Sequence, residues 1–553
     1  MSLHPSVAGR LARLAPDQRA AATATPGPLL CIAPAGSGKT TTLVARVAWL
    51  IACGAASPGE IAAITFNKRA AEELTERLGV ALEPLGVEPG AVRVRTFHAL
   101  GREILRDAGV PVDPLVDRMA ILRHILPAAG PAAWRRLDTA FSRLKLDIGV
   151  TAEEVAADPE PGPVARAFVA YEEALAAAGG LDFDDLVARA LRLLGAEAAL
   201  LARWRARCAH LLVDEAQDLD RAQLSLALQL AAPANRIFLV GDDDQSIYGW
   251  RLADVRRVLG LADALPGLRR VDLEVNYRCP RTVVERAVRL VEHNEERFAK
   301  AIRAGPEASG PIILAADSSD ETVRLGRVFE RWPEDDDATR AILARTNREL
   351  LPAIAVALDR RVPFRPPAIE LLVASPHVDL ALDEAAGLAG ADGLPVLARL
   401  ERVRERWASL PPDPADDPDV ARPADIARAL VAWAVPYPRL EDVRAAVAAR
   451  RASLAELCRD DALLSLATAH GTKGLEFDHV AVIGLDAGRF PSRRSVTESP
   501  EPQRALEEER RLAYVAWTRA RRSLTLVYDP GAPSPFLVEA FSPEELGLSD
   551  DST

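Results

Sequence analysis

The sequence predicts an α/β protein with two parallel sheets, each interrupted by a helical insertion. Short apolar runs with the length of buried strands alternate with segments whose apolar residues recur at helical spacing, and this alternation is typical of parallel sheets. Several runs, such as residues 237–240, end in polar side chains, as strands do where open parallel sheets bind ligands. At 553 residues the chain is too long for one hydrophobic core, so we expect several domains.

The composition is that of an ordinary globular protein. Hydrophobic residues make up 49% and charged residues 27% of the chain, and the formal net charge is -12. A nucleic-acid site would therefore have to be a local groove lined with Arg. The cysteines are far apart, with no CxxC pair and no clustered His, so neither a zinc site nor a disulfide framework is indicated. We expect a cytoplasmic protein without a membrane partner, because no apolar signal core and no stretch of about 18 apolar residues is present.

Lysine is rare in this sequence. Only five lysines, at positions 39, 68, 145, 300 and 473, stand among 68 basic residues. Lys39 and Lys473 fall inside the candidate motifs described below. The compact ammonium group of lysine is better suited than the planar guanidinium group of arginine to point a charge at a phosphate.

Residues 33–40, Ala-Pro-Ala-Gly-Ser-Gly-Lys-Thr, lie between a strand predicted at 29–32 and a segment with helical spacing. This is the context of a phosphate-binding loop, although Ala33 stands where the general pattern has its first glycine. Backbone N–H groups can converge on the β-phosphate, Lys39 can reach the β/γ oxygens, and the Thr40 hydroxyl can hold Mg²⁺. We expect the nucleotide to bind Ala35, Gly36, Ser37, Gly38, Lys39, Thr40 and Thr41.

Two carboxylates follow the strand predicted at 211–213. Asp214 can bind Mg²⁺ through water, and Glu215 can orient and deprotonate the attacking water. Adjacent carboxylates are costly to crowd unless a cation shares them. The competing interpretation is a solvated, acidic start of a helix.

Residues 240–251, Val-Gly-Asp-Asp-Asp-Gln-Ser-Ile-Tyr-Gly-Trp-Arg, follow another apolar strand. Gln245 can contact a phosphate, and Tyr248 and Trp250 can stack on bases a few positions later. We interpret this segment as a link between nucleotide chemistry and nucleic-acid contact.

The remaining chain is divided by its periodicity. Residues 101–204 and 366–462 show helical spacing, the second with a linker-like loop at 409–418. The polar run 181–186 predicts a capped helix start. A strand is predicted at 271–275, with a helix from Asn276 to about 296, and another helix at 507–520 with Arg519 near its end. A second sheet is predicted from residues 312–314, 341–343, 463–467, 480–483 and 524–527.

The ordered motifs resemble those of the superfamily 1 helicases of the UvrD/Rep/PcrA group, from Gln18 to about Tyr528. The most specific strings are GDDDQSIYGWR, EEERRLAYVAWTRA and TAHGTKGLEF. The resemblance implies two RecA-like domains. The implied division is a first RecA-like domain at 1–100 and 205–275, a helical insertion at 101–204, a second RecA-like domain at 276–365 and 463–535, a reduced helical insertion at 366–462 and a C-terminal tail at 536–553.

The resemblance also implies roles for single residues. It implies that Mg-ATP is hydrolysed with Lys39, Glu215 and Gln245 at the γ-phosphate, and with Arg278 and Arg519 as arginine fingers from the second domain. Mg²⁺ would be held by Thr40 and Asp214. The implied contacts to adenine and ribose are Gln18, Tyr277 and Glu476. The residues implied to track the DNA strand are Phe66, His98, Tyr248, Trp250, Arg251 and His470.

By resemblance, the function is that of an ATP-dependent 3′–5′ translocase on single-stranded DNA and a DNA helicase at junctions of single and double strands, in DNA repair or recombination. The second insertion is shorter than the family's full-length one. An alternative is therefore a translocase that needs a partner, such as a repair, nuclease or defence-system protein, to unwind. A nucleotide-gated DNA-binding subunit is a further alternative, which the intact Lys39, Glu215 and both arginines disfavour. Strand-stimulated ATPase and unwinding assays separate the three.

Overall fold

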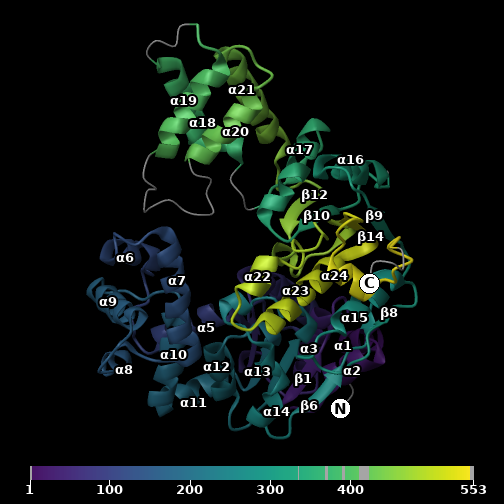
Figure 1. Cartoon of the computed structure of the whole chain (residues 1–553). Coiled ribbons are helices and arrows are strands. Elements are labelled where there is room, and N and C mark those ends of the chain that lie inside the picture. Colours follow the sequence, from purple (N-terminus) through teal and green to yellow (C-terminus); the bar gives the residue numbers. More distant parts are fainter. Residues whose placement is uncertain (1–2, 334, 368–370, 389–392, 410–422, 549–553) are drawn as a thin grey trace.

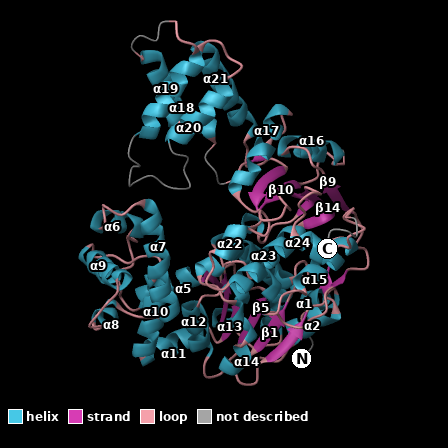
Figure 2. Ribbon diagram, in the orientation of Figure 1, coloured by secondary structure: helices cyan, strands magenta, loops and turns pink. Residues whose placement is uncertain are grey.

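The computed structural model describes residues 3–333, 335–367, 371–388, 393–409 and 423–548. Two sheet-containing lobes form the body of the molecule, and two further helical masses, blue and green in Figure 1, both lie on the left of the view. Figure 2 shows these two masses as entirely helical. The predicted α/β class with two parallel sheets is confirmed. Within the described residues, no helix has the length and apolar character needed to cross a membrane.

The first sheet has six parallel strands in the order β3-β2-β4-β5-β1-β6. Its strands are β1 (Leu29–Ile32), β2 (Ile61–Thr65), β3 (Arg93–Thr96), β4 (His210–Val213), β5 (Ile237–Gly241) and β6 (Arg269–Asp272). Because every pair is parallel, the loops that follow the strands open at one edge of the sheet. The predicted phosphate loop, the Asp214–Glu215 pair and the 240–251 segment therefore share that edge.

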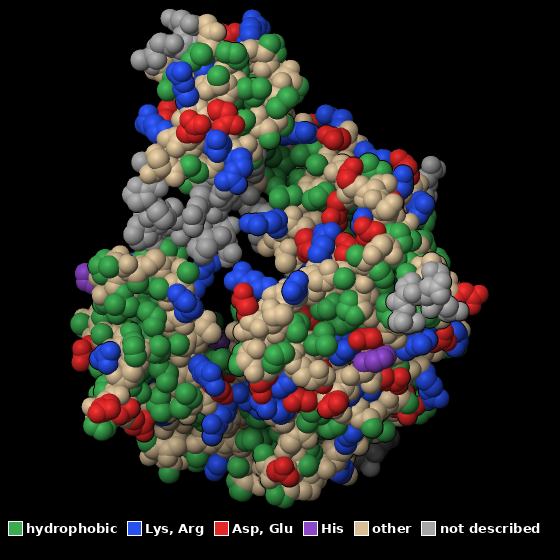
Figure 3. Space-filling view, viewed as in Figure 1, with side chains coloured by type: hydrophobic (Ala, Val, Ile, Leu, Met, Phe, Trp, Pro, Cys, Tyr) green, Lys and Arg blue, Asp and Glu red, His purple; other side chains and the backbone are tan. Residues whose placement is uncertain are grey.

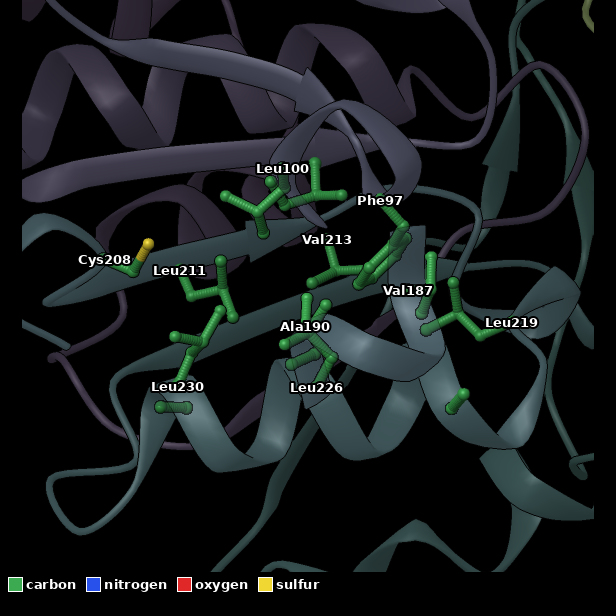
Figure 4. Packing of buried hydrophobic residues seen from close by; sticks show 14 of the residues in the cluster. Phe97, Leu100, Val187, Ala190, Cys208, Leu211, Val213, Leu219, Leu226 and Leu230 are labelled. Atoms are coloured by element: carbon green, nitrogen blue, oxygen red, sulfur yellow. The ribbon is translucent and has the colours of Figure 1, made fainter. Parts of the chain in front are cut away.

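Both faces of this sheet are buried, since alternate strand residues point to opposite sides. Leu29 and Cys31 face a core that includes residues of α1 (Pro5–Ala12), α2 (Pro16–Thr23), α3 (Lys39–Ala52) and α4 (Lys68–Leu82), whereas Leu30 and Ile32 face the other core. That second core, shown in Figure 4, is covered by α5 (Phe97–Asp107), α10 (Asp185–Ala196), α11 (Ala198–Arg207) and α12 (Arg221–Ala231).

The first insertion is smaller than the predicted 101–204. Since α5, α10 and α11 pack on the sheet, only the helices between them form a separate core, around Trp134, Phe141, Phe168 and Tyr171. Those elements are α6 (Arg118–Ile125), α7 (Pro131–Ser142), a π-helical turn (Arg143–Ile148), α8 (Ala152–Ala156) and α9 (Pro163–Ala177).

A buried ion network joins this insertion to α10. Lys145 Nζ lies 2.8 Å from Asp182 and 3.1 Å from Asp185, and Arg118 lies 2.7 Å from Asp182 and 2.6 Å from Asp184. Burial opposes the charge of Asp182, but Lys145 and Arg118 lower the pKa of its carboxyl well below the ordinary range. The predicted cap is present, because Asp182 accepts from the Asp185 N–H at 2.9 Å, but the ion network was not predicted.

The second sheet also has six parallel strands, in the order β11-β12-β10-β13-β14-β9. One face packs on α15 (Arg281–Val291), α23 (Pro502–Trp517) and α24 (Pro535–Ala540), and the other on α16 (Glu321–Arg331) and α17 (Leu351–Asp359). The strands are β9 (Ile312–Ala316), β10 (Arg340–Ala344), β11 (Phe364–Arg365), β12 (Leu464–Thr468), β13 (Phe477–Val482) and β14 (Ala520–Tyr528). Short helices complete the two lobes: α13 (Val255–Leu259), α14 (Leu261–Ala264) and α22 (Arg493–Thr497).

The strand predicted at 271–275 and the helix predicted from Asn276 were wrong. β6 ends at Asp272, and β7 (Val275–Asn276) pairs with β8 (Arg303–Ala304) in a separate two-stranded sheet. The Asn276 side chain accepts from the N–H groups of Arg278 and Cys279, both at 2.8 Å, so the chain turns here and α15 begins only after Pro280. Similarly, α23 ends at Trp517, and Arg519 lies in the turn that follows it.

The second insertion and the predicted tail also have different limits. Helices α18 (Pro376–Gly387), α19 (Val396–Ser409), α20 (Pro423–Ala434) and α21 (Leu440–Leu457) share a core, but Leu454 and Leu457 pack on the second sheet. Residues 410–418 of the predicted linker lie outside the described residues. Segment 536–553 is not a tail in its described part, because Phe536 and Leu537 are fully buried in the core between the second sheet and α15, α23 and α24.

The ion network generates a stability prediction. Lys145→Met should destabilise the protein by about 3–5 kcal/mol, because Asp182 and Asp185 would stay buried without their shared ammonium. Thermal unfolding followed by circular dichroism measures this change. Lys68→Met is the matched control, since the Lys68 side chain is 90% exposed in its pair with Glu72. Equal stability of the two variants would contradict a stabilising role for Lys145.

Candidate functional site

The phosphate loop needs glycine at two positions. Gly36 and Gly38 have φ angles of 67° and 81°, in the left-handed region that favours glycine. A Cβ atom at Gly36 would lie 2.6 Å from Arg278 Cβ, and one at Gly38 would lie 2.6 Å from Gln18 Nε2. The loop is thus pressed between Gln18 and Arg278, and α3 begins directly after it at Lys39.

Gln18 supports the loop from behind. Its Nε2 donates to the Ser37 carbonyl at 2.8 Å, and its Oε1 accepts from the Ala15 N–H at 3.1 Å. Gln18 is buried and is absent from the cleft wall that the described residues form. The structure therefore assigns its amide to loop geometry, whereas the resemblance implied an adenine contact.

Lys39 and the two carboxylates form the charged floor of the site. Lys39 Nζ lies 3.2 Å from Glu215 Oε2, and Gln217 Nε2 donates to the same oxygen at 2.6 Å. Burial and the charge of Glu215 raise the pKa of Asp214, whereas Lys39 and Lys473 lower the pKa of Glu215 despite its burial. Glu215 is thus the carboxylate held in the charged form. Its φ of 52° also places it in the left-handed region, which is a strained conformation for Glu.

The donor set fits Mg²⁺ bound jointly with phosphate oxygens. Thr40 and Asp214 both line the cleft, and a divalent cation would stabilise the Asp214 anion that burial disfavours. Across the described ranges, no group of three or more His, Cys, Asp and Glu side chains is arranged to hold a metal alone. This matches the way Mg²⁺ is usually bound, by one or two protein ligands together with substrate phosphates.

The cleft between the two lobes has a volume of about 1100 Å³. Tyr277, Arg278 and Glu476 of the second lobe face the loop, and Arg278 Nε donates to Glu476 Oε2 at 2.7 Å. The Tyr277 N–H donates to the Gly36 carbonyl at 2.9 Å across the cleft. The predicted nucleotide residues that line this cleft are Ala35, Gly36, Ser37, Gly38, Lys39, Thr40, Thr41, Asp214, Glu215, Gln245, Tyr277, Arg278, Glu476 and Arg519.

Arg519 is a buried cation in the cleft wall. It is 1% exposed, and its guanidinium donates to the Val515 and Leu475 carbonyls at 2.9 and 3.0 Å and to Gln245 Oε1 at 3.1 Å. In the part of the chain that the structure describes, it makes no ion pair with a carboxylate. Burial and the nearby charge of Arg278 lower its pKa. A buried, uncompensated cation is costly unless an anion joins it, and this one lies beside a phosphate-binding loop.

Gln245 connects the two lobes. Its Nε2 donates to Asp242 Oδ2 at 2.6 Å, and its Oε1 accepts from Arg519. Three residues further on, the Tyr248 ring stacks on Phe66, with centroids 5.0 Å apart and planes at 10°. The Trp250 ring lies edge-on to Tyr248 at 6.2 Å, and the Arg251 guanidinium lies 4.6 Å from the Trp250 centroid.

These four side chains form a continuous aromatic and basic surface at the end of the predicted segment. Trp250 is 59% exposed, which leaves a ring face available to a base. Figure 3 shows Lys and Arg side chains around the hollow between the lobes and the helical insertions. The acidic net charge thus coexists with local basic groups.

The two predicted histidines, His98 and His470, are largely buried and uncharged. His98 stacks on Phe183, with centroids 3.9 Å apart, and burial lowers its pKa to about 4. His470 follows β12, and burial together with Arg345 and Lys473 lowers its pKa to about 4. Both rings are therefore neutral near pH 7 and are available for stacking or hydrogen bonding, but not for charge pairing.

Sequence reasoning missed Phe183, Asn276 and Lys300 as site residues, and it placed Lys473 in a motif without giving it a specific contact. Lys473 Nζ bonds to Asp218 and, at 2.6 Å, to the Gln245 carbonyl across the cleft. The rarity of lysine, which drew attention to Lys473, could also have found Lys300. Four of the five lysines have side chains at most 15% exposed, in ion pairs, and only Lys68 is on the open surface.

Comparisons with known proteins agree with this geometry. Residues 14–266 match the model of the UvrD/REP helicase N-terminal domain, and residues 439–530 match that of the UvrD-like helicase C-terminal domain, together more than half of the chain. The chain is 29% identical to DNA helicase II of Escherichia coli, over 92% of this chain and 84% of that protein. It is 26% identical to ATP-dependent DNA helicase Rep of Escherichia coli, over 93% of this chain and 90% of that protein.

A third relative matches more closely over a shorter stretch. ATP-dependent DNA helicase PcrA of Staphylococcus epidermidis is 33% identical, over 52% of this chain and 41% of that protein. The alignment with DNA helicase II runs over 608 positions, so it contains gaps opposite segments that this chain lacks. Two domain models in chain order, relatives that span most of the length and two parallel sheets around one cleft agree. The chain belongs to the UvrD/Rep helicase family.

Proposed function

We propose that this protein is an ATP-hydrolysing DNA helicase that moves along single-stranded DNA. The observation that carries the proposal is the cleft, which Lys39 of the first lobe and Arg519 of the second both line. Arg519 is a buried cation that has no carboxylate partner among the residues that the structure describes. Gln245 contacts Arg519 and lies three residues from Tyr248. One short segment therefore runs from the proposed γ-phosphate position to the proposed DNA surface.

The residues of the cleft have complementary tasks in hydrolysis. Lys39 neutralises the β/γ oxygens, and charged Glu215 orients and deprotonates the attacking water. Arg519 and Arg278 stabilise charge that develops on the transferred phosphoryl group. Mg²⁺ held by Thr40 and Asp214 would supply further charge neutralisation. Tyr277 and Glu476 are placed to contact the base and ribose, since both line the same cleft.

Hydrolysis is coupled to movement through closure of the cleft. Nucleotide that binds Lys39 and the two arginines together favours the closed arrangement, and hydrolysis removes this bridge. Phe66, Tyr248, Trp250 and Arg251 then grip and release bases, with His98 and His470 as further strand contacts. The 3′–5′ direction, the action at strand junctions and the role in repair or recombination are part of the proposal, supported by the family.

Removal of the Lys39 ammonium should abolish ATP turnover. Lys39→Ala should retain less than about a tenth of the wild-type kcat, because charge stabilisation at the β/γ oxygens is worth several kcal/mol and each 1.36 kcal/mol is tenfold. Phosphate release in the presence of poly(dT) measures this rate. Lys68→Ala, on the open surface, should remain near wild type. Turnover by Lys39→Ala above a tenth would argue against the phosphate loop.

Truncation of Trp250 should separate DNA stimulation from basal hydrolysis. Trp250→Ala should keep the ATPase rate without DNA but need about tenfold more poly(dT) for half-maximal stimulation, since stacking is worth about 1–3 kcal/mol per base. Trp250→Phe is the matched control, because it retains a ring that stacks. A parallel loss of basal and stimulated rates in Trp250→Ala would indicate a core aromatic instead.

The helicase activity itself is tested by strand separation. The purified chain should unwind a duplex with a 3′ single-stranded tail in the presence of Mg-ATP, and should leave a 5′-tailed duplex intact. Displacement of a fluorescent strand measures both. If DNA stimulates the ATPase but the duplex is not unwound, the protein is instead a translocase that requires a partner. If DNA does not stimulate the ATPase, the protein is instead a nucleotide-gated DNA-binding subunit.

A further inference from the structure

Residues 242–254, which we call the bridging segment, begin and end in the first lobe but are held in the middle by the second. The segment follows β5, and the residues after it, Val258 and Leu261, return to the core of the first sheet. Between these ends, Ile247 is fully buried in the core of the second lobe. A segment with this connection must deform when the two lobes move relative to each other.

The acidic start of the bridging segment is clamped by a loop of the second lobe. Arg297 donates to both carboxylate oxygens of Asp244, at 3.0 and 2.9 Å. Lys300 Nζ bonds to Asp243 and lies 2.9 Å from Asp244 and 3.4 Å from Asp242. The Lys300 side chain is 1% exposed and the three carboxylates are completely buried. Paired groups buried this deeply fix orientation, because breaking one pair leaves an uncompensated charge.

That loop is in turn fixed to α23, the helix that leads to Arg519. The N–H groups of Glu295 and Glu296 donate to the Glu507 carboxylate at 3.0 and 3.2 Å. Arg510 donates to the Asn294 side chain at 2.6 Å. The same loop also contacts the first lobe, because Phe298 packs on the core of the first sheet and Arg270 donates to the Ala299 carbonyl at 2.8 Å. The clamp on Asp242–Asp244 therefore links the first sheet to the helix that leads to the proposed arginine finger.

The distal part of the bridging segment is held by α23 directly. The Gly249 N–H, between Tyr248 and Trp250, donates to Glu508 Oε1 at 2.9 Å. Glycine permits this approach, since a Cβ atom there would lie 2.5 Å from Glu508 Oε2. Arg504 adds a second contact, 3.0 Å from both Asp254 and Glu296. The anchors thus lie on both sides of the partly buried Tyr248 ring and the exposed Trp250 ring.

We propose that Arg297, Lys300, Arg504 and Glu508 are positioning residues that attach the aromatic part of the bridging segment to the second lobe. Tyr248 and Trp250 then follow α23, whereas Phe66, which stacks on Tyr248, follows the first sheet. Movement of the lobes changes the spacing of these rings, and this is how nucleotide state reaches the DNA. The inference rests on the proposed DNA-stimulated ATPase and names the residues that couple its two sites.

Glu508 offers the cleanest test, because it is only partly buried and makes one contact to the bridging segment. Glu508→Ala removes the acceptor for the Gly249 N–H, whereas Glu508→Gln keeps Oε1. The ATPase kcat and KM without DNA should stay within about twofold of wild type in both variants. The kcat at saturating poly(dT) should fall about tenfold in Glu508→Ala only. The lost hydrogen bond has a charged acceptor, and a loss of about 1.4 kcal/mol in free energy corresponds to a tenfold lower rate.

Two further variants make the test specific. Glu498→Ala is the matched control, because it breaks the exposed Arg494–Glu498 pair within the second lobe and should keep full stimulation. Gly249→Ala should reproduce the loss by pushing Glu508 away, and the double variant Gly249→Ala/Glu508→Ala should lose no more than either single variant. Gly249→Ala also serves as the test if Glu508→Ala does not fold, as judged by circular dichroism.

The outcomes separate this inference from the proposed function. If poly(dT) stimulates the ATPase of the wild-type protein, and stimulates Glu508→Ala and Gly249→Ala to the same extent, the positioning role is overturned. The helicase proposal then still stands. Equal losses in Glu508→Ala and Glu508→Gln, or additive losses in the double variant, would also overturn it. A wild-type protein that poly(dT) does not stimulate would overturn both.

Discussion

The arrangement of charge in the cleft between the two sheets is the constraint on which the rest of the structure depends. Within the described ranges, Lys39, Lys473 and Arg278 are each paired with a carboxylate, but Arg519 is buried without one. Burial of these groups makes every charge costly to leave unpaired, so the two lobes are held in register by ion pairs and by Gln245. An anion with several phosphate oxygens complements this set better than any neutral ligand.

The close contact between the two lobes also explains why glycine stands at two positions near the cleft. Gly36 approaches Arg278 and Gly249 approaches Glu508 so closely that a methyl group would collide at either position. Both glycines lie where one lobe touches the other. Close packing at these points couples the two lobes mechanically, because displacement of the second lobe is passed to the phosphate loop through Arg278 and to the bridging segment through α23.

The sequence was sufficient for features with a local cause. Strand and helix periodicity located β1, β4, β5, β9, β10 and β12 within a residue or two, and the phosphate loop was recognisable from its glycines between a strand and a helix. It was insufficient where contacts are distant. The turn at Asn276, the burial of Phe536 and the packing of α5 and α11 on the first sheet depend on partners far along the chain, which periodicity does not register.

The sequence by itself therefore determined the family, the fold class and the candidate nucleotide and DNA residues, because each of these depends on residue type at fixed local spacing. Only the tertiary structure decided which residues meet. It turned Gln18 toward the loop carbonyl, placed Phe183 on His98, and brought Lys300 to three aspartates some 57 positions away. The reason is physical: ion pairs and stacked rings form between side chains that packing of the two sheets brings together, and linear spacing carries no record of that packing.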